Sequence, residues 1–71
     1  MIRLLINGRD VELPEATRLL DYLARLGVDA RAVAVEVNGR ILERSEYPAT
    51  VLGEGDAVEI VRMVGGGVSG L

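Results

Sequence analysis

The chain opens with Ile2-Arg3-Leu4-Leu5-Ile6-Asn7-Gly8-Arg9-Asp10-Val11-Glu12-Leu13, and this segment carries the clearest structural signal in the sequence. Its apolar residues occupy alternate positions on either side of Asn7-Gly8, and a period of two is typical of strands with one buried face. Asn7-Gly8 favours a tight type I′ turn, because both residues tolerate a positive φ. Pro14 lacks a ladder donor and ends the second strand. Residues 2–13 therefore predict a β-hairpin whose inward residues are Ile2, Leu4, Ile6, Val11 and Leu13.

A single amphipathic helix is predicted over Arg18–Leu26, a segment without Gly or Pro. Its apolar stripe repeats at spacings of three and four and comprises Leu19, Tyr22, Leu23 and Leu26. We expect the hydroxyl of Thr17 to cap the first turn. Gly27 follows the last turn, where a left-handed residue commonly ends a helix.

Three more strands are predicted, over Val33–Val37, Arg40–Leu42 and Ala57–Val64. Asn38-Gly39 joins the first two through a second tight turn. Residues 43–52 lack a clear period, and we expect them to be irregular with one helical turn around Ser45–Tyr47. The last strand is apolar on both faces, which indicates either a central place in the sheet or a face that meets a partner.

The predicted order of elements is β-β-α-β-β-β, with one helix available to cover one sheet. Connection rules favour a mixed sheet wrapped over that helix, with the first and last strands parallel at its centre. This α+β arrangement is the β-grasp, or ubiquitin-like, fold, with four to five strands packed on one main helix. We expect one domain over residues 1–64 and a flexible Gly-rich tail over residues 65–71, because a chain of 71 residues has length for a single small core.

The composition excludes several kinds of site. The sequence contains no Cys, His or Lys, which excludes disulfides, zinc or iron–sulfur ligation by Cys and His, and thiol, imidazole or lysine catalysts. The net charge of −3 argues against nucleic-acid binding by phosphate neutralisation. No segment approaches the about 20 apolar residues of a membrane span, and the N-terminus lacks the pattern of a signal peptide. We expect a cytoplasmic protein with neither a metal site nor a catalytic side chain.

The end of the sequence, Met63-Val64-Gly65-Gly66-Gly67-Val68-Ser69-Gly70-Leu71, follows directly on the last predicted strand. Such a segment is either a frayed terminus or a terminus with a chemical function. Glycine lacks a Cβ, so an extended glycine end can thread a narrow enzyme channel and present its carboxylate. Since no side chain in the sequence offers an obvious reactive group, the second reading gives the chain a chemical use.

The sequence resembles the ThiS family, the sulfur carriers of thiamine biosynthesis. The resemblance runs through most of the chain, and its order and spacing are more specific than any one part. It rests on Asn7-Gly8, Thr17–Leu23, Val33–Ile41, Gly53–Ile60 and Val64–Gly67.

The resemblance implies acyl chemistry at a main-chain carboxylate. An adenylating enzyme of the ThiF type would use ATP and Mg²⁺ to convert the terminal glycine carboxylate, at Gly67 or Gly66, to an acyl-adenylate. A sulfur donor, such as the persulfide of a cysteine desulfurase, would displace AMP, and thiazole synthase (ThiG) would receive the sulfur from the resulting thiocarboxylate. The chain itself would be a carrier, not an enzyme, and would bind no cofactor. Gly65, Gly66 and Gly67 would thread the partner's active site.

The sequence departs from the family pattern after its glycines, because Val68-Ser69-Gly70-Leu71 follows Gly67. We expect a protease to remove these four residues and leave Gly67 as the terminus, with a cut after Gly66 as the alternative. Partner contacts are predicted at Val61, Arg62, Met63 and Val64, beside the tail. For Val61 and Met63 the competing interpretation is packing in the core.

The other polar residues have structural interpretations, and the chain has alternative functions. The acidic residues are interpreted as solvated strand and turn positions, and Asn7 and Asn38 as turn residues. A MoaD-like carrier for molybdopterin or another sulfur-transfer pathway would share the mechanism. A TGS-like binding module would have no use for the glycine tail, and a protein-conjugating modifier would leave isopeptide-linked adducts.

Overall fold

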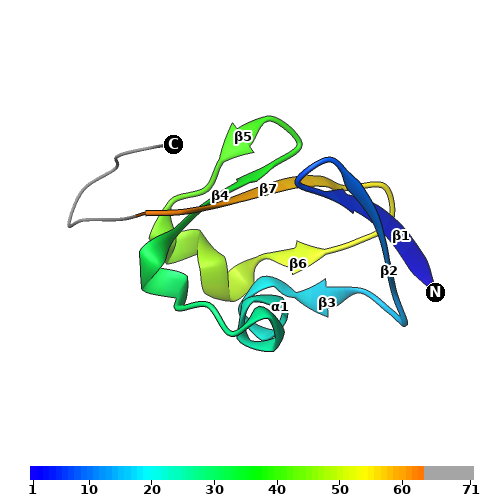
Figure 1. Cartoon of the computed structure of the whole chain (residues 1–71), viewed down its shortest axis with the longest axis horizontal. Helices are drawn as coiled ribbons and strands as arrows, with labels where there is room; N and C mark the ends of the chain where they lie inside the picture. The colour runs from blue at the N-terminus through cyan, green and yellow to red at the C-terminus, as the bar shows by residue number, and fades with distance from the viewer. Residues whose placement is uncertain (64–71) are drawn as a thin grey trace.

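A five-stranded mixed sheet curves over one α-helix, and a small second sheet lies beside that helix (Figure 1). The computed structural model describes residues 1–63. The large sheet has the strand order β2-β1-β7-β4-β5, and α1 spans Leu19–Leu26. Its strands are β1 (Ile2–Ile6), β2 (Arg9–Leu13), β4 (Val33–Val37), β5 (Arg40–Ile41) and β7 (Ala57–Arg62). The second sheet pairs β3 (Thr17–Arg18) with β6 (Val51–Leu52), and two 3₁₀ helices, η1 (Ala30–Ala32) and η2 (Arg44–Ala49), complete the fold.

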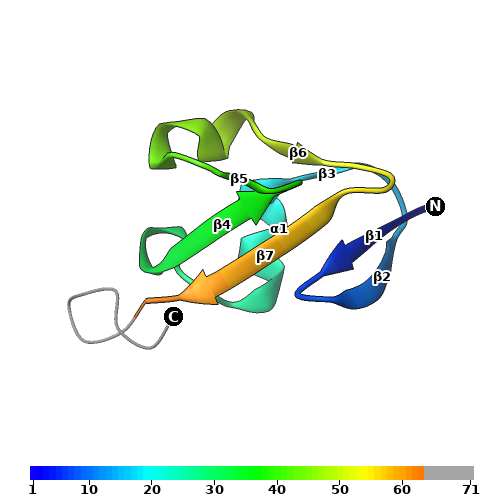
Figure 2. The same cartoon turned by 90° about the horizontal axis from the view of Figure 1, so that it is seen from above.

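The strand pairings confirm the predicted β-grasp topology. β1 and β7 run parallel, with Leu5 opposite Ala57 and Ile6 opposite Val58. β7 is antiparallel to β4, and the two outer pairs, β1–β2 and β4–β5, are antiparallel hairpins. β7 therefore lies between β1 and β4 at the centre of the sheet, which is one of the two interpretations of its apolar composition (Figure 2).

The predicted turns and the helix end are also confirmed. Asn7 and Asn38 both have a φ of 52°, and the glycine that follows each is left-handed too. Gly27 ends α1 with a φ of 76°, and its N–H donates to the carbonyl of Ala24. The sequence predicts these turns and this helix end correctly because they depend on the conformational preferences of adjacent residues.

The predicted cap of the helix is wrong. Thr17 belongs to β3, is 6% exposed, and donates its hydroxyl to the carbonyl of Glu15 at 2.9 Å. The helix begins at Leu19, not Arg18, and the Leu19 N–H donates to the carbonyl of Thr50. A backbone carbonyl near β6 thus satisfies a donor that the prediction assigned to a side chain. At the other end, Leu26 is 50% exposed and lies outside the core, so the buried stripe is shorter than predicted.

The segment predicted to be irregular is more regular than expected. Within residues 43–52, η2 covers six residues rather than one turn, and β6 pairs with β3. Strands of two residues are too short to show a period, which is why the sequence pattern missed both. The return strand predicted over Arg40–Leu42 ends at Ile41. The last strand ends at Arg62, and Val64, where it was predicted to end, lies outside the described residues.

An aliphatic core joins the sheet to the helix. Tyr47 supplies one of its two aromatic rings and donates its hydroxyl to the carbonyl of Val33 at 3.0 Å. Among residues 1–63, no helix is long and apolar enough to cross a membrane. The buried apolar residues are Leu4, Ile6, Leu13, Leu19, Tyr22, Leu23, Val33, Val35, Leu42, Tyr47, Leu52 and Val58.

Candidate functional site

The predicted tail falls outside the part of the chain that the structure describes. Gly65, Gly66 and Gly67, the Val64 before them and the segment Val68–Leu71 all belong to residues 64–71. The structure does describe the base from which the tail departs. That base is the end of β7, which lies at the opposite end of the molecule from the N-terminus (Figure 1).

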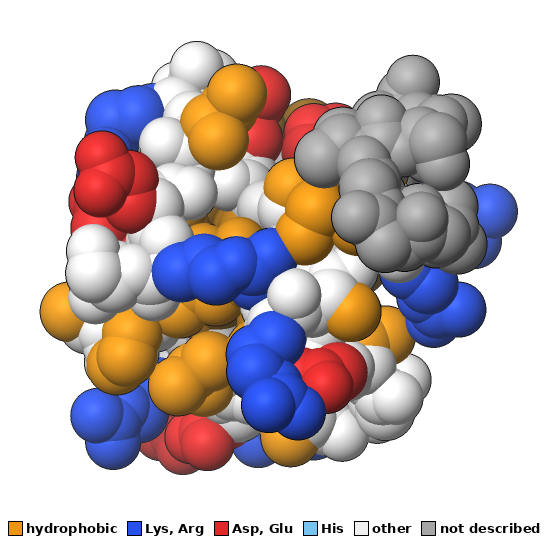
Figure 3. Space-filling model, turned by 90° about the vertical axis from the view of Figure 1, so that its left-hand side faces the viewer, with side chains coloured by type: hydrophobic (Ala, Val, Ile, Leu, Met, Phe, Trp, Pro, Cys, Tyr) orange, Lys and Arg blue, Asp and Glu red, His pale blue; other side chains and the backbone are white. Residues whose placement is uncertain are grey.

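The end of β7 is paired with β4 along its whole length. Val61 lies opposite Ala34, and the N–H of Met63 donates to the carbonyl of Ala32 at 2.8 Å. Arg62 is exposed and Met63 is half-buried. Hydrophobic and basic side chains are interspersed on the end of the molecule where β7 terminates (Figure 3).

Val61 lies on the open face of the sheet, away from the helix. Along β7, Val58 is buried and Ile60 packs against the core, whereas Val61 is 36% exposed. Alternation of side chains along a strand places Glu59 on the same open face. The competing interpretation of Val61, packing in the core, is therefore wrong for this residue. Its exposed position is compatible with the predicted partner contact.

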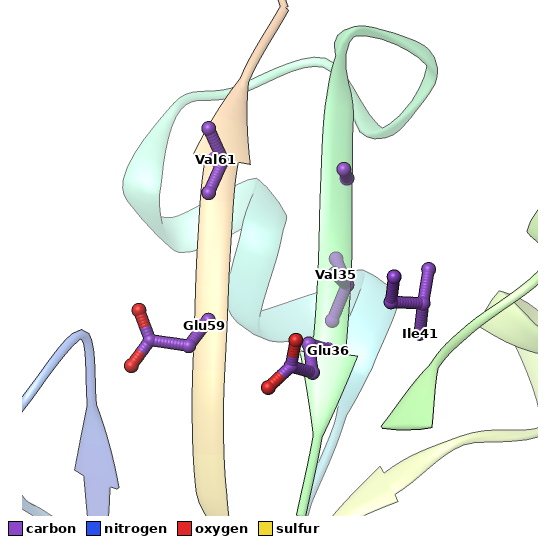
Figure 4. A pocket seen from close by; sticks show the side chains of 6 residues that line it. Val35, Glu36, Ile41, Glu59 and Val61 are labelled. Carbon is purple, nitrogen blue, oxygen red and sulfur yellow. The ribbon is translucent and has the colours of Figure 1, made fainter. Parts of the chain in front are cut away.

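An open groove of about 180 Å³ lies on this face between β7, β4 and β5 (Figure 4). Apolar side chains form most of its lining, and Ile41 is 71% exposed at its edge. We call this surface the open-face groove. It is lined by Ala34, Val35, Glu36, Ile41, Glu59 and Val61.

Two carboxylates interrupt the apolar lining. Glu36 and Glu59 lie directly opposite one another in the β4–β7 ladder. Like charges at such positions destabilise a sheet, and neither carboxylate forms an ion pair with another of residues 1–63. The sequence pattern indicates only solvated positions for these two residues. Their juxtaposition depends on the register between β4 and β7, for which no local motif exists.

Other acidic residues have structural partners. Asp56 accepts hydrogen bonds from the N–H of Gly53 and from Nδ2 of Asn38, which closes the turn before β7. Glu46 accepts from the Arg40 guanidinium at 2.7 Å, and this ion pair lowers the pKa of the Glu46 carboxyl. Within residues 1–63 there is no group of three or more acidic, Cys or His residues that could hold a metal ion. The interpretation of these carboxylates as turn and surface groups agrees with their contacts.

Comparison with known proteins identifies relatives along almost the whole chain. The model of the ThiS family matches residues 3–67, a range that includes Gly65, Gly66 and Gly67. The sulfur carrier protein ThiS of Bacillus subtilis (strain 168) is 37% identical over 63 residues, which are 87% of this chain and 96% of that protein. A crystal structure of the thiamine biosynthesis protein ThiS from Geobacter metallireducens superposes with a TM-score of 0.79 at 38% identity, covering 93% of this chain and 100% of that one.

A second kind of relative is much longer than this chain. A thiazole synthase of Paramagnetospirillum magneticum is 39% identical over 66 residues. These residues make up 93% of this chain but only 20% of the synthase. The chain thus spans about one fifth of that relative's length.

Proposed function

The chain belongs to the ThiS family, and on this basis we propose that it is a sulfur carrier of thiamine biosynthesis rather than an enzyme. The observation that carries the proposal is the family match, which runs through the β-grasp domain and includes the three glycines up to Gly67. The similar protein of Bacillus subtilis is a sulfur carrier protein over nearly its whole length, which supports the same role here. These matches favour thiamine biosynthesis over a molybdopterin carrier or a TGS-like module.

The proposed chemistry takes place at the main-chain carboxylate of Gly67. A carboxylate is a poor electrophile, so a partner of the ThiF type first transfers AMP from ATP to it and releases pyrophosphate. Mg²⁺ in that partner neutralises phosphate charge during the transfer. A persulfide on a donor such as a cysteine desulfurase then displaces AMP and forms an acyl disulfide. A dithiol reductant cleaves the sulfur–sulfur bond, which leaves the thiocarboxylate on the carrier and a free thiol on the donor, while the dithiol is oxidised to a disulfide. The carrier contributes the end of its backbone and binds neither ATP nor Mg²⁺ itself.

This chemistry requires Gly67 to be the terminal residue. Val68 follows Gly67 in the sequence, so a protease has to cut between them before activation. A branched side chain near the carboxylate would not fit a channel shaped for glycine, which is why the uncut chain should be inactive. A cut after Gly66 would leave two glycines and is the alternative.

The open-face groove is the proposed contact surface for partners, together with Val61, Arg62, Met63 and Val64 beside the tail. A partner side chain that is apolar would fit between Val61 and Ile41, and an arginine or lysine next to it would compensate the paired carboxylates on the same face. The partners proposed are the adenylating enzyme and thiazole synthase. The segment of the Paramagnetospirillum magneticum thiazole synthase that is similar to this chain supports the synthase as the sulfur acceptor.

The experiment compares a chain ending at Gly67 with the chain ending at Leu71. Each is incubated with a ThiF-type enzyme, ATP, Mg²⁺, a cysteine desulfurase with cysteine, and a dithiol reductant, and its intact mass is measured. We expect the chain ending at Gly67 to gain the mass of one oxygen-to-sulfur exchange and the longer chain to remain unchanged. A folded chain ending at Gly67 that never accepts AMP would contradict the proposal. Equal modification of both chains would contradict the requirement for cleavage but not the carrier function.

A further inference from the structure

β7 continues beyond the end of its neighbour β1. The parallel ladder between the two strands ends with Ile6 opposite Val58, and the N–H of Asn7 donates to the carbonyl of Val58 at 2.8 Å. The chain then turns away at Asn7-Gly8, while β7 runs on to Arg62. On this side of β7, the N–H and carbonyl of Ile60 face the position that β1 would occupy if it were longer.

The side chain of Asn7 occupies that position. Its Oδ1 accepts the N–H of Ile60 at 2.7 Å, and its Nδ2 donates to the carbonyl of Ile60 at 3.2 Å. A side-chain amide carries the same donor and acceptor as a peptide group. Asn7 therefore extends the parallel ladder by one step after the backbone of β1 has left the sheet. Without it, β7 beyond Val58 would be held by β4 alone.

Few residue types could do this from the same place. Asn7 has a φ of 52°, a conformation that Gly, Asn and Asp adopt more readily than other residues. Of these three, only Asn offers both a donor and an acceptor at neutral pH. The turn alone would be satisfied by glycine, so the hydrogen bonds to Ile60 are a separate property of Asn7.

The second turn of the fold provides an internal comparison. Asn38 also has a φ of 52°, and its Oδ1 accepts the N–H of Ala57 at 2.9 Å. Its Nδ2 donates to Asp56 rather than to β7. Asn38 thus supports the beginning of β7, whereas Asn7 holds its later half, directly before Val61 and Arg62.

We propose that Asn7 is a positioning residue for sulfur transfer, which holds the end of β7, the base of the glycine segment, in an extended conformation. The proposal rests on the proposed function of the chain as a sulfur carrier. An end of β7 that is already ordered spares the activating enzyme the entropy cost of ordering it during docking. Loss of Asn7 therefore weakens the recognition of the carrier, while the adenylation step itself is unchanged.

The test compares Asn7→Gly with Asn38→Gly, since both substitutions keep a left-handed turn and remove one asparagine amide next to β7. Backbone amide exchange is measured on the full chain. Loss of the hydrogen bonds from Asn7 should speed exchange at Ile60, and at Met63, whose N–H donates to Ala32, by about two- to ten-fold relative to Asn38→Gly. Exchange at Leu23, a buried residue within α1, reports any general loss of stability.

The rate of adenylation is then measured by ATP–pyrophosphate exchange with the ThiF-type enzyme. The carriers used in this assay end at Gly67, and this truncation leaves all described elements intact. Asn7→Gly should raise the KM for the carrier about two- to ten-fold with kcat unchanged, and Asn38→Gly should leave both near wild type. Asn7→Asp keeps the acceptor for the Ile60 N–H and loses the donor, so its KM should lie between those of Asn7→Gly and wild type.

The outcomes separate the two proposals. Equal KM values for Asn7→Gly, Asn38→Gly and wild type, or equal exchange at Ile60, would overturn the role of Asn7 and leave the carrier function standing. If the wild-type carrier takes up no AMP although it is folded, the carrier function fails and the role of Asn7 in transfer fails with it.

Discussion

At the scale of single residues, the polar contacts of this protein are concentrated in turns and short helices. Glu46 is one example, because its carboxylate accepts from the Arg40 guanidinium and from the N–H of Glu43 at 2.9 Å. The second contact is half of a reciprocal capping box that begins η2. The Glu46 carboxylate therefore links β5 to η2, the 3₁₀ helix that follows it.

The pKa of Glu46 leads to a prediction about acid stability. The hydrogen bond from Arg40 holds this pKa below its ordinary value of 4.5. A carboxyl whose pKa is lower in the folded state adds stability that is fully present above its unfolded pKa and is lost as the pH falls through its folded pKa. Glu46→Gln should therefore be less stable than wild type near neutral pH, and the difference should shrink as the pH falls below 4.5 and through the folded pKa of Glu46.

Urea unfolding from about pH 7 to about pH 3 measures this convergence. Glu15→Gln serves as the control, because it removes the same charge from an exposed loop position without an ion pair among residues 1–63. A constant difference between Glu46→Gln and wild type across the range would show that the carboxylate's charge is not involved.

At the scale of elements, the junction between β3 and α1 differs most from its sequence pattern. Thr17 precedes a helix, as a capping residue would, yet it is buried and paired with Leu52. Arg18 occupies the N-cap position with an extended backbone and makes no side-chain capping bond. The small second sheet thus determines where the helix starts.

This junction predicts opposite effects for one substitution at two adjacent positions. Arg18→Asn places a good capping side chain at the true N-cap and should raise the free energy of unfolding by about 0.5–1 kcal/mol. Thr17→Asn introduces a larger polar group into a buried strand position and should lower it by about 1–3 kcal/mol. Chemical denaturation of both variants measures the difference. Stabilisation by Thr17→Asn would mean that Thr17, after all, caps the helix.

At the scale of the whole molecule, one face of the large sheet is left uncovered by the other elements of residues 1–63. The helix and the second sheet lie on the other face (Figure 2). The open-face groove runs along β7 towards the base of the tail (Figure 4). The apolar composition of β7 on both faces has two consequences here. One side packs in the core, and the other lines a surface that we propose partners use.

The groove predicts a separation of stability from partner recognition. Ile41 is 71% exposed, so Ile41→Ser should change the free energy of unfolding by only about 0.5 kcal/mol. It should nevertheless raise the KM for the adenylating enzyme several-fold, because the partner loses an apolar contact. Steady-state adenylation with carriers ending at Gly67 measures this effect.

Leu26→Ser is the matched control. Leu26 is 50% exposed but lies at the end of α1, away from the open-face groove. It should leave the KM near wild type. Similar KM changes for the two variants would show that the enzyme does not recognise the open-face groove specifically.

The sequence alone determined the features that depend on neighbouring residues. Asn7-Gly8, Asn38-Gly39 and Gly27 specify positive φ angles locally, and the alternation in Ile2–Ile6 and Val33–Val37 specifies which side is buried. From these the β-grasp topology follows, because one helix can cover only one face of the sheet. The sequence likewise shows that glycines follow the last strand, although these residues lie outside the described part of the chain.

Only the tertiary structure decided the features that depend on contacts between distant segments. The burial of Thr17 comes from β6, and the opposition of Glu36 and Glu59 comes from the register of β4 on β7. The hydrogen bonds from Asn7 to Ile60 likewise depend on where β1 stops beside β7. Register and strand length are set by the packing of the whole core, and residues that are far apart in sequence leave no periodic signal of their meeting.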